Sequence, residues 1–154
     1  MVLPLPDEAI RLNVEAEDWR AAVREAGGAL VDSGVTMPEY TDEMIATVDK
    51  LGPYIVIAPG IALAHSRPSP AVLHAGCSWV TLAQPVEFGN AVNDPVSLVI
   101  GLAAIDHDGH LELMAALAAV LADNDRLALA MTATTPAQLR EALSDASDEG
   151  KEQG

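Results

Sequence analysis

Apolar residues first alternate with polar residues along this chain and then recur with a helical period. In residues 8–16 every second position is apolar, which is typical of a half-buried strand. From Asp18 onward apolar residues return every three or four positions, and Gly34 follows the last of them as a C-terminal cap. The pattern therefore predicts a strand, followed by a helix that Asp18 opens and Gly34 closes.

A second helix and a strand-rich centre are expected next. Thr36 can cap this helix, Pro38 fits its first turn and Gly52 ends it. The dipeptide Pro59-Gly60 favours a turn between the first two strands that follow. The last strand is apolar almost throughout, as expected of a central strand covered on both faces. The predicted strands are 54–57, 61–64, 76–82 and 96–105.

Three further helices are expected after the strands. Asp108 caps the first of them, and Thr134 or Thr135 caps the last. Their ranges are 110–122, 126–131 and 136–143. The element order β-α-α-β-β-β-α-α-α favours an α+β fold with a mixed sheet covered by helices. We expect one domain over residues 1–143 and an acidic, disordered tail over 144–154.

The charge balance limits the partners. The 154 residues carry a net charge of −15, which argues against nucleic acid and against an anionic membrane surface. Such a field would steer a basic protein partner, although solubility alone would also account for it. No targeting segment or apolar run of about 18 residues is visible. With Cys77 as the single cysteine, the composition predicts a cytoplasmic protein.

The stretch from Gly60 to Pro68 carries the most chemistry. An apolar strand ends there on His65, and Ser66 and Arg67 follow. Imidazole is partly neutral and nucleophilic near pH 7, and a strand end holds it on a stiff element that still faces solvent. Covalent chemistry in this protein is therefore expected at His65.

The other histidines differ in what their positions indicate. His110 falls at the start of a predicted helix, where unpaired N–H groups favour an anion and disfavour imidazolium. It could converge with His65 on one anion site, although spacing alone leaves its function open. His74 and His107 fit exposed imidazoles without a function. Residues 106–110 are dense in potential ligands but lack an established metal-binding spacing, so we expect no metal site.

A longer segment around His65 carries a family resemblance. Residues 52–68, Gly-Pro-Tyr-Ile-Val-Ile-Ala-Pro-Gly-Ile-Ala-Leu-Ala-His-Ser-Arg-Pro, resemble the active-site segment of enzyme IIA domains of the bacterial phosphoenolpyruvate-dependent sugar phosphotransferase system. The resemblance is to the mannitol/fructose-type superfamily and, within it, to the L-ascorbate branch. It extends over roughly residues 10–143 through further matches at 80–88, 93–96 and 103–106 and at His110.

The resemblance implies a fold and a function. The fold would be a three-layer α/β/α arrangement with a central mixed sheet. His65 would accept a phosphoryl group on its Nε2 (tele) nitrogen from the phosphocarrier protein HPr and pass it to a cysteine of enzyme IIB. Enzyme IIB then phosphorylates L-ascorbate or a related sugar that enters through the membrane component, enzyme IIC. His110 would stabilise the phosphoryl group, Ser66 and Arg67 are candidates to bind it, and no cofactor is implied.

One alternative function and three departures from the family pattern accompany this interpretation. A regulatory module of the same fold, reporting phosphorylation state to a partner protein, is the alternative function, and relatives of this kind can form homodimers. Ala64 stands where the family has proline, which we expect to loosen the loop and to restore an N–H donor. Ser66 stands where the family has alanine or glycine. The arginine that mannitol-type relatives carry upstream has no clear counterpart, and Lys50 is a poor candidate.

Overall fold

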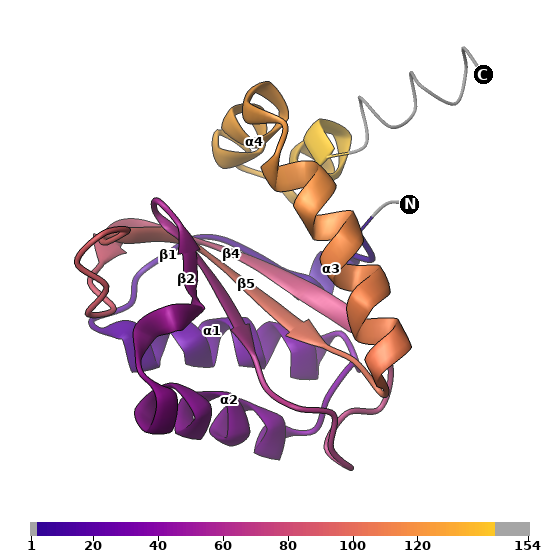
Figure 1. The fold of residues 1–154 in the computed structure, drawn as a ribbon. Coiled ribbons are helices and arrows are strands. Elements are labelled where there is room, and N and C mark those ends of the chain that lie inside the picture. Colours follow the sequence, from indigo (N-terminus) through magenta and orange to yellow (C-terminus); the bar gives the residue numbers. More distant parts are fainter. Residues whose placement is uncertain (1–2, 144–154) are drawn as a thin grey trace.

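A five-stranded mixed sheet forms the centre of the molecule (Figure 1). The computed structural model describes residues 3–143. The strand order across the sheet is β1-β4-β5-β3-β2, with β5 antiparallel to β4 and parallel to β3. The strands are β1 (Ile10–Val14), β2 (Val56–Ala58), β3 (Ile61–His65), β4 (Gly76–Val86) and β5 (Val96–Ala103).

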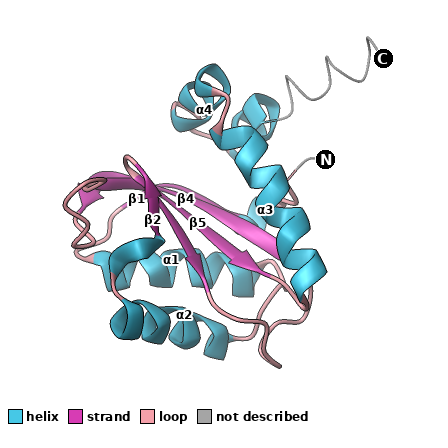
Figure 2. Cartoon of the chain, viewed as in Figure 1, coloured by secondary structure: helices cyan, strands magenta, loops and turns pink. Residues whose placement is uncertain are grey.

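Helices cover both faces of the sheet (Figure 2). On one face α1 (Trp19–Asp32) and α2 (Pro38–Leu51) bury their apolar sides. On the other face lies α3 (His107–Leu121), followed by α4 (Asn124–Met131) and a last helical segment, residues 136–143. The expected α+β fold with three α/β/α layers is confirmed. Within residues 3–143, every helix is too short or too polar to cross a membrane.

The alternation of β5 explains why it lies in the middle. Val99 and Ala103 pack into the apolar core under α1 and α2, whereas Leu98, Ile100 and Leu102 pack into the core under α3. All five are at most 1% exposed. Fully burying one aliphatic side chain of this size contributes about 1.5–3 kcal/mol. A strand that is apolar on both faces is therefore held from both sides, as the sequence pattern predicts.

Several predicted boundaries shift in the structure. All five predicted strands are present, including the separate strands β2 and β3 on either side of Pro59-Gly60, so the element order β-α-α-β-β-β-α-α-α, which has only four, is one strand short. Tyr54 belongs to a 3-10 turn, Pro53–Ile55, rather than to a strand. A second 3-10 turn, Asp7–Ala9, precedes β1. The predicted tail at 144–154 lies outside the described residues.

The predicted helix caps are partly right. The Asp18 carboxylate accepts a hydrogen bond from Ala21 N–H at 2.8 Å, as predicted. The expected Thr36 cap is wrong, because Thr36 is buried in a bridge to Val72 and α2 begins after Met37 with Pro38 in its first turn.

The remaining caps lie in the second half of the chain. The expected Asp108 cap is also wrong, because the Asp106 carboxylate accepts from Gly109 N–H at 2.8 Å and α3 begins at His107. At the last helical segment Thr135 Oγ1 accepts from Gln138 N–H at 3.2 Å, which confirms one of the two predicted caps.

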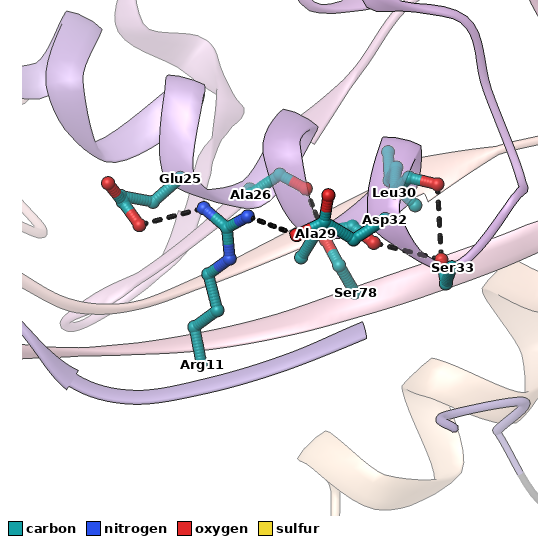
Figure 3. A network of polar contacts seen from close by, with 8 residues as sticks. All are labelled: Arg11, Glu25, Ala26, Ala29, Leu30, Asp32, Ser33 and Ser78. Carbon is teal, nitrogen blue, oxygen red and sulfur yellow. Dashed lines mark hydrogen bonds and ion pairs between the residues drawn. The ribbon is translucent and has the colours of Figure 1, made fainter. Parts of the chain in front are cut away.

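A polar network fastens α1 to the sheet (Figure 3). The Arg11 guanidinium on β1 donates to Glu25 at 2.9 Å and to Asp32 at 2.8 Å, two carboxylates that lie two turns apart on α1. On β4 the buried Ser78 hydroxyl donates to the Ala26 carbonyl at 2.8 Å. These contacts bring the backbone of α1 close to the sheet, directly over β5.

The close approach explains the glycine at position 101 of β5. A Cβ added to Gly101 would collide with Ser78 Oγ and would lie 3.2 Å from Leu30 Cδ1 and 3.3 Å from the Ala26 carbonyl oxygen. We therefore expect Gly101→Ala to lower the free energy of unfolding by about 1–3 kcal/mol, the usual cost of overpacking a core. Urea denaturation measures this change.

A double-mutant cycle separates the collision from a general loss of packing. Ser78→Ala removes the hydroxyl that meets the new methyl group, so Gly101→Ala should cost less in the Ser78→Ala background than in the native one. Equal costs in both backgrounds, or no cost in either, would contradict the close contact.

Candidate functional site

His65 is the last residue of β3 and faces the α3 side of the sheet. Side chains alternate along a strand, so His65 shares its face with Ile61 and Leu63, both in the core under α3. Ala64 points the other way, toward α1 and α2, and is 1% exposed. It pairs in register with Gly101 of β5. The prediction of a loosened loop at Ala64 is therefore wrong, because this residue is part of the paired sheet.

The start of α3 lies beside this strand end. β3 and β5 run parallel and their last register pair is His65 with Leu102, so both chains leave the sheet at the same edge. The chain continues from β5 into α3, with His107 at its first position and His110 one turn further. The rings of His65 and His110 lie 6.1 Å apart between centroids, at an interplanar angle of 44°. The structure thus brings these two histidines together, as expected.

A cavity of about 670 Å³ opens at this edge. The side chains around it come from α2, from the segment that follows β3 and from the start of α3. They are Glu43, Thr47, Lys50, Leu51, Tyr54, His65, Ser66, Arg67, Pro68, Ser69, His107 and His110. Three of the four histidines of the chain therefore share one cavity.

The tautomer of His65 follows from one hydrogen bond. Its Nδ1 lies 2.9 Å from the carbonyl oxygen of Leu63. A carbonyl oxygen can only accept a hydrogen bond, so Nδ1 must carry the proton. In the neutral ring the lone pair is then on Nε2, the nitrogen farther from the backbone. His65 is half-buried, so its ring is held by the strand and is still accessible from the cavity.

His110 is kept neutral at this site. Burial lowers its pKa below the ordinary value of 6.5, and the neighbouring rings of His65 and His107 lower it further. A neutral imidazole can donate a hydrogen bond from one ring nitrogen to an anion without adding a full charge. The α3 N-terminus supplies a partial positive charge at the same place.

The cavity also gathers free cations. Among residues 3–143, the side chains of Lys50 and Arg67 line it without an ion pair. Four other arginines are each bound to a carboxylate elsewhere on the surface: Arg11, Arg20, Arg24 and Arg140. In a chain of net charge −15, two unpaired cations at one cavity favour an anion there. Lys50, a poor candidate from the sequence, lies at the site after all.

Ser66 is held by α2 through two different groups. Its backbone N–H donates to the Tyr40 hydroxyl at 2.9 Å. Its own hydroxyl lies 3.2 Å from Thr47 Oγ1, and the single proton of Thr47 is donated to the Glu43 carbonyl at 2.9 Å. Ser66 is therefore the donor toward Thr47. Both donors of Ser66 are engaged within the protein.

The sequence did not single out several residues that lie at or beside this site. The sequence predicts an exposed imidazole at His107, and the ring is exposed, but it also lines the cavity. Its spacing of three from His110 places both on one side of a helix. Tyr40 and Thr47 lie two turns apart on α2, and their contacts with Ser66 leave no local pattern. Across residues 3–143, no three His, Cys, Asp or Glu side chains gather closely enough to hold one metal ion.

Comparison with known proteins identifies related chains. The family model described as "Phosphoenolpyruvate-dependent sugar phosphotransferase system, EIIA 2" matches residues 4–146. The ascorbate-specific PTS system EIIA component of Escherichia coli (strain K12) is 43% identical over 107 residues, which is 70% of each chain.

Two solved structures extend the likeness to the fold. The mannitol-specific cryptic phosphotransferase enzyme IIA of Escherichia coli has a TM-score of 0.80 at 33% identity, covering 91% of this chain and 95% of that one. The complex of the mannitol enzyme IIA with phosphorylated enzyme IIB, also from Escherichia coli, gives a TM-score of 0.80 at 28% identity. It covers 93% of this chain and 99% of that one. The resemblance seen in the sequence is confirmed.

The neighbouring rings predict how His110 titrates. In an NMR titration its pKa should lie below 6.5, and His107→Gln or His65→Gln should raise it by removing a nearby cation. Because the unfolded chain then binds more protons than the folded one below pH 6.5, this group makes the protein less stable as the pH falls through that range.

His74→Gln is the matched control, because His74 lies outside the cavity and should leave the His110 titration unchanged. A His110 pKa at or above 6.5, or one that neither cavity substitution moves, would contradict the coupling.

Proposed function

The chain belongs to the EIIA 2 family of the phosphoenolpyruvate-dependent sugar phosphotransferase system, and from this premise we propose that His65 carries the phosphoryl group. As a member of that family it is a phosphotransferase component. The observation that carries the proposal is the hydrogen bond from His65 Nδ1–H to the Leu63 carbonyl. It leaves the lone pair on Nε2 of a ring at the cavity, where a donor can approach.

The proposed loading step is an in-line displacement. The Nε2 lone pair of His65 attacks phosphorus on phospho-HPr, the N–P bond forms, and the bond between phosphorus and its carrier atom on HPr breaks with its electron pair. The proton on Nδ1 stays in its hydrogen bond to the Leu63 carbonyl. This acceptor stabilises the positive charge that the ring gains when Nε2 bonds to phosphorus. Positioning and electrostatics supply most of the catalysis in such transfers.

The groups around the cavity suit a phosphoryl group. His110 offers a neutral N–H donor, and Arg67 and Lys50 offer unpaired positive charge. Ser66 stays a predicted ligand, because its hydroxyl would have to exchange Thr47 for a phosphoryl oxygen. The acidic surface elsewhere would attract a basic face on a partner and raise the encounter rate.

The proposed unloading step passes the group to enzyme IIB. A cysteine thiolate of that partner attacks phosphorus, the S–P bond forms and the N–P bond to His65 breaks, which returns the neutral ring. The structural similarity of this chain to the solved complex of the mannitol enzyme IIA with phosphorylated enzyme IIB supports such a partner. Through enzymes IIB and IIC the step would support uptake of L-ascorbate or a related sugar, an assignment supported by the ascorbate-specific relative.

Phosphoryl labelling tests the acceptor. With labelled phosphoenolpyruvate, enzyme I and HPr, the native protein should become labelled and His65→Ala should not. His110→Ala should still accept the label, but about 10²-fold more slowly, the usual effect of removing one donor that faces developing charge.

His74→Ala serves as the control for loss of an imidazole outside the cavity and should label like the native protein. Full labelling of His65→Ala would refute His65 as the phosphoryl acceptor. An unchanged labelling rate in His110→Ala would refute the stabilising role of His110.

A chase experiment tests the direction of transfer. Isolated, labelled protein mixed with an ascorbate-type enzyme IIB should lose its label to that partner, whereas enzyme IIB with its acceptor cysteine changed to serine should receive none. Label that stays on this chain with every enzyme IIB offered would contradict the carrier role. That outcome would favour the alternative, a regulatory module that reports phosphorylation state.

A further inference from the structure

The Tyr40 hydroxyl lies between backbone groups at the ends of β3 and β5, the two strands that lead to the site. Tyr40 is a residue of α2, and its side chain is completely buried. Its hydroxyl accepts from Ser66 N–H at 2.9 Å and lies 2.9 Å from the carbonyl oxygen of Leu102 and 3.2 Å from that of Ser66. A phenol has one proton to donate, and the Leu102 carbonyl is the nearer acceptor.

The register of the sheet shows what this hydroxyl replaces. The Gly60 carbonyl accepts from Ser97 N–H at 2.8 Å and from Leu98 N–H at 3.1 Å. Only the second bond fits the register that pairs Ile61 with Leu98, so the even-numbered residues of β5 are the ones that bond to β3. By this alternation the bond after the last pair would run directly from Ser66 N–H to the Leu102 carbonyl. In the structure both groups bind the Tyr40 hydroxyl instead. Two consecutive hydrogen bonds through the Tyr40 hydroxyl therefore replace the single bond that would extend the pairing of β3 with β5.

We propose that Tyr40 is a positioning residue, whose hydroxyl keeps the ends of β3 and β5 apart so that His65 and His110 face one phosphoryl group. The proposal rests on the proposed function of His65. The Tyr40 hydroxyl, which we call the wedge, lies where both strands leave the sheet. Ser66 directly follows His65, and Leu102 lies near the end of β5, from which the chain continues into α3. Tyr40 does not line the cavity, so it acts through the backbone and not on the substrate.

Because Tyr40 is buried, its phenol stays protonated and neutral. Burial raises the pKa of its phenol to about 12, so the proton stays available to the Leu102 carbonyl across the physiological range. Thr47, two turns further along α2, binds the Ser66 hydroxyl and thereby holds the same residue from the side chain. One face of α2 therefore determines where the chain lies immediately after His65.

Tyr40→Phe removes the hydroxyl and keeps the ring in the core. In the labelling reaction kcat should fall about 10- to 100-fold, because small misplacements of reacting groups have effects of this size. KM for phospho-HPr should stay unchanged, because a buried side chain does not touch the partner. The pKa of His110 should also move in the variant, because the spacing of the histidine rings changes.

Ser78→Ala is the matched control. It too removes a buried hydroxyl that donates to a backbone carbonyl, yet it lies under α1 and away from the cavity. It should lose stability without a change in kcat or in the His110 titration. If Tyr40→Phe behaves like Ser78→Ala, Tyr40 is a structural residue only and the proposal is overturned.

Two measurements separate this proposal from the proposed function. If the native protein accepts no label at His65, the proposed function fails, but the His110 titration of Tyr40→Phe still tests the wedge. Should Tyr40→Phe fail to fold, hydrogen exchange on the native protein decides. A strongly protected Ser66 amide and a slowly exchanging Tyr40 hydroxyl proton are expected, and rapid exchange of both would overturn the proposal.

Discussion

The parallel pairing of β3 with β5 is the constraint on which the site depends. Parallel strands end at the same edge of a sheet, so His65, at the end of one strand, lies beside the start of the helix that follows the other. The two strands are held in this register by apolar side chains on both faces of β5. The ring of His65 is in turn fixed by its own strand, through the carbonyl of Leu63. His65 and His110 therefore owe their relative geometry to the core.

The distribution of charge over the whole chain differs from that at the cavity. The chain as a whole is strongly acidic, and four of its arginines are neutralised by carboxylates that tie surface elements together. The unpaired Lys50 and Arg67 lie at the cavity with three imidazoles and the N-terminus of α3. A long-range negative field can thus steer a basic partner, while the local environment favours an anion such as the phosphoryl group of the proposed function. The neutral state of His110 keeps the attraction modest, which suits the onward transfer that we propose.

Much of this fold follows from patterns of short range. Alternation located the strands and the strand end at His65, and the Asp18 cap was correct because side chain and N–H lie within one turn. At the start of α3 two aspartates fit the cap equally well, and only the path of the chain out of β5 selects Asp106. The contacts of Tyr40 with residues 26 and 62 positions away had no signal in the sequence, because tertiary packing alone brings them together. His107 differs, because its spacing of three from His110 is a local signal that places both imidazoles on one side of a helix.

We propose that His65 carries the phosphoryl group on Nε2 because its Nδ1 proton is bound to the backbone. NMR of the phosphorylated protein, with ¹⁵N-labelled histidine and detection of ³¹P, tests it most directly. Phosphorus should be coupled to Nε2 of His65, with the Nδ1 proton still present and hydrogen-bonded. Phosphorus on Nδ1 of His65, or on the ring of any other histidine, would contradict it.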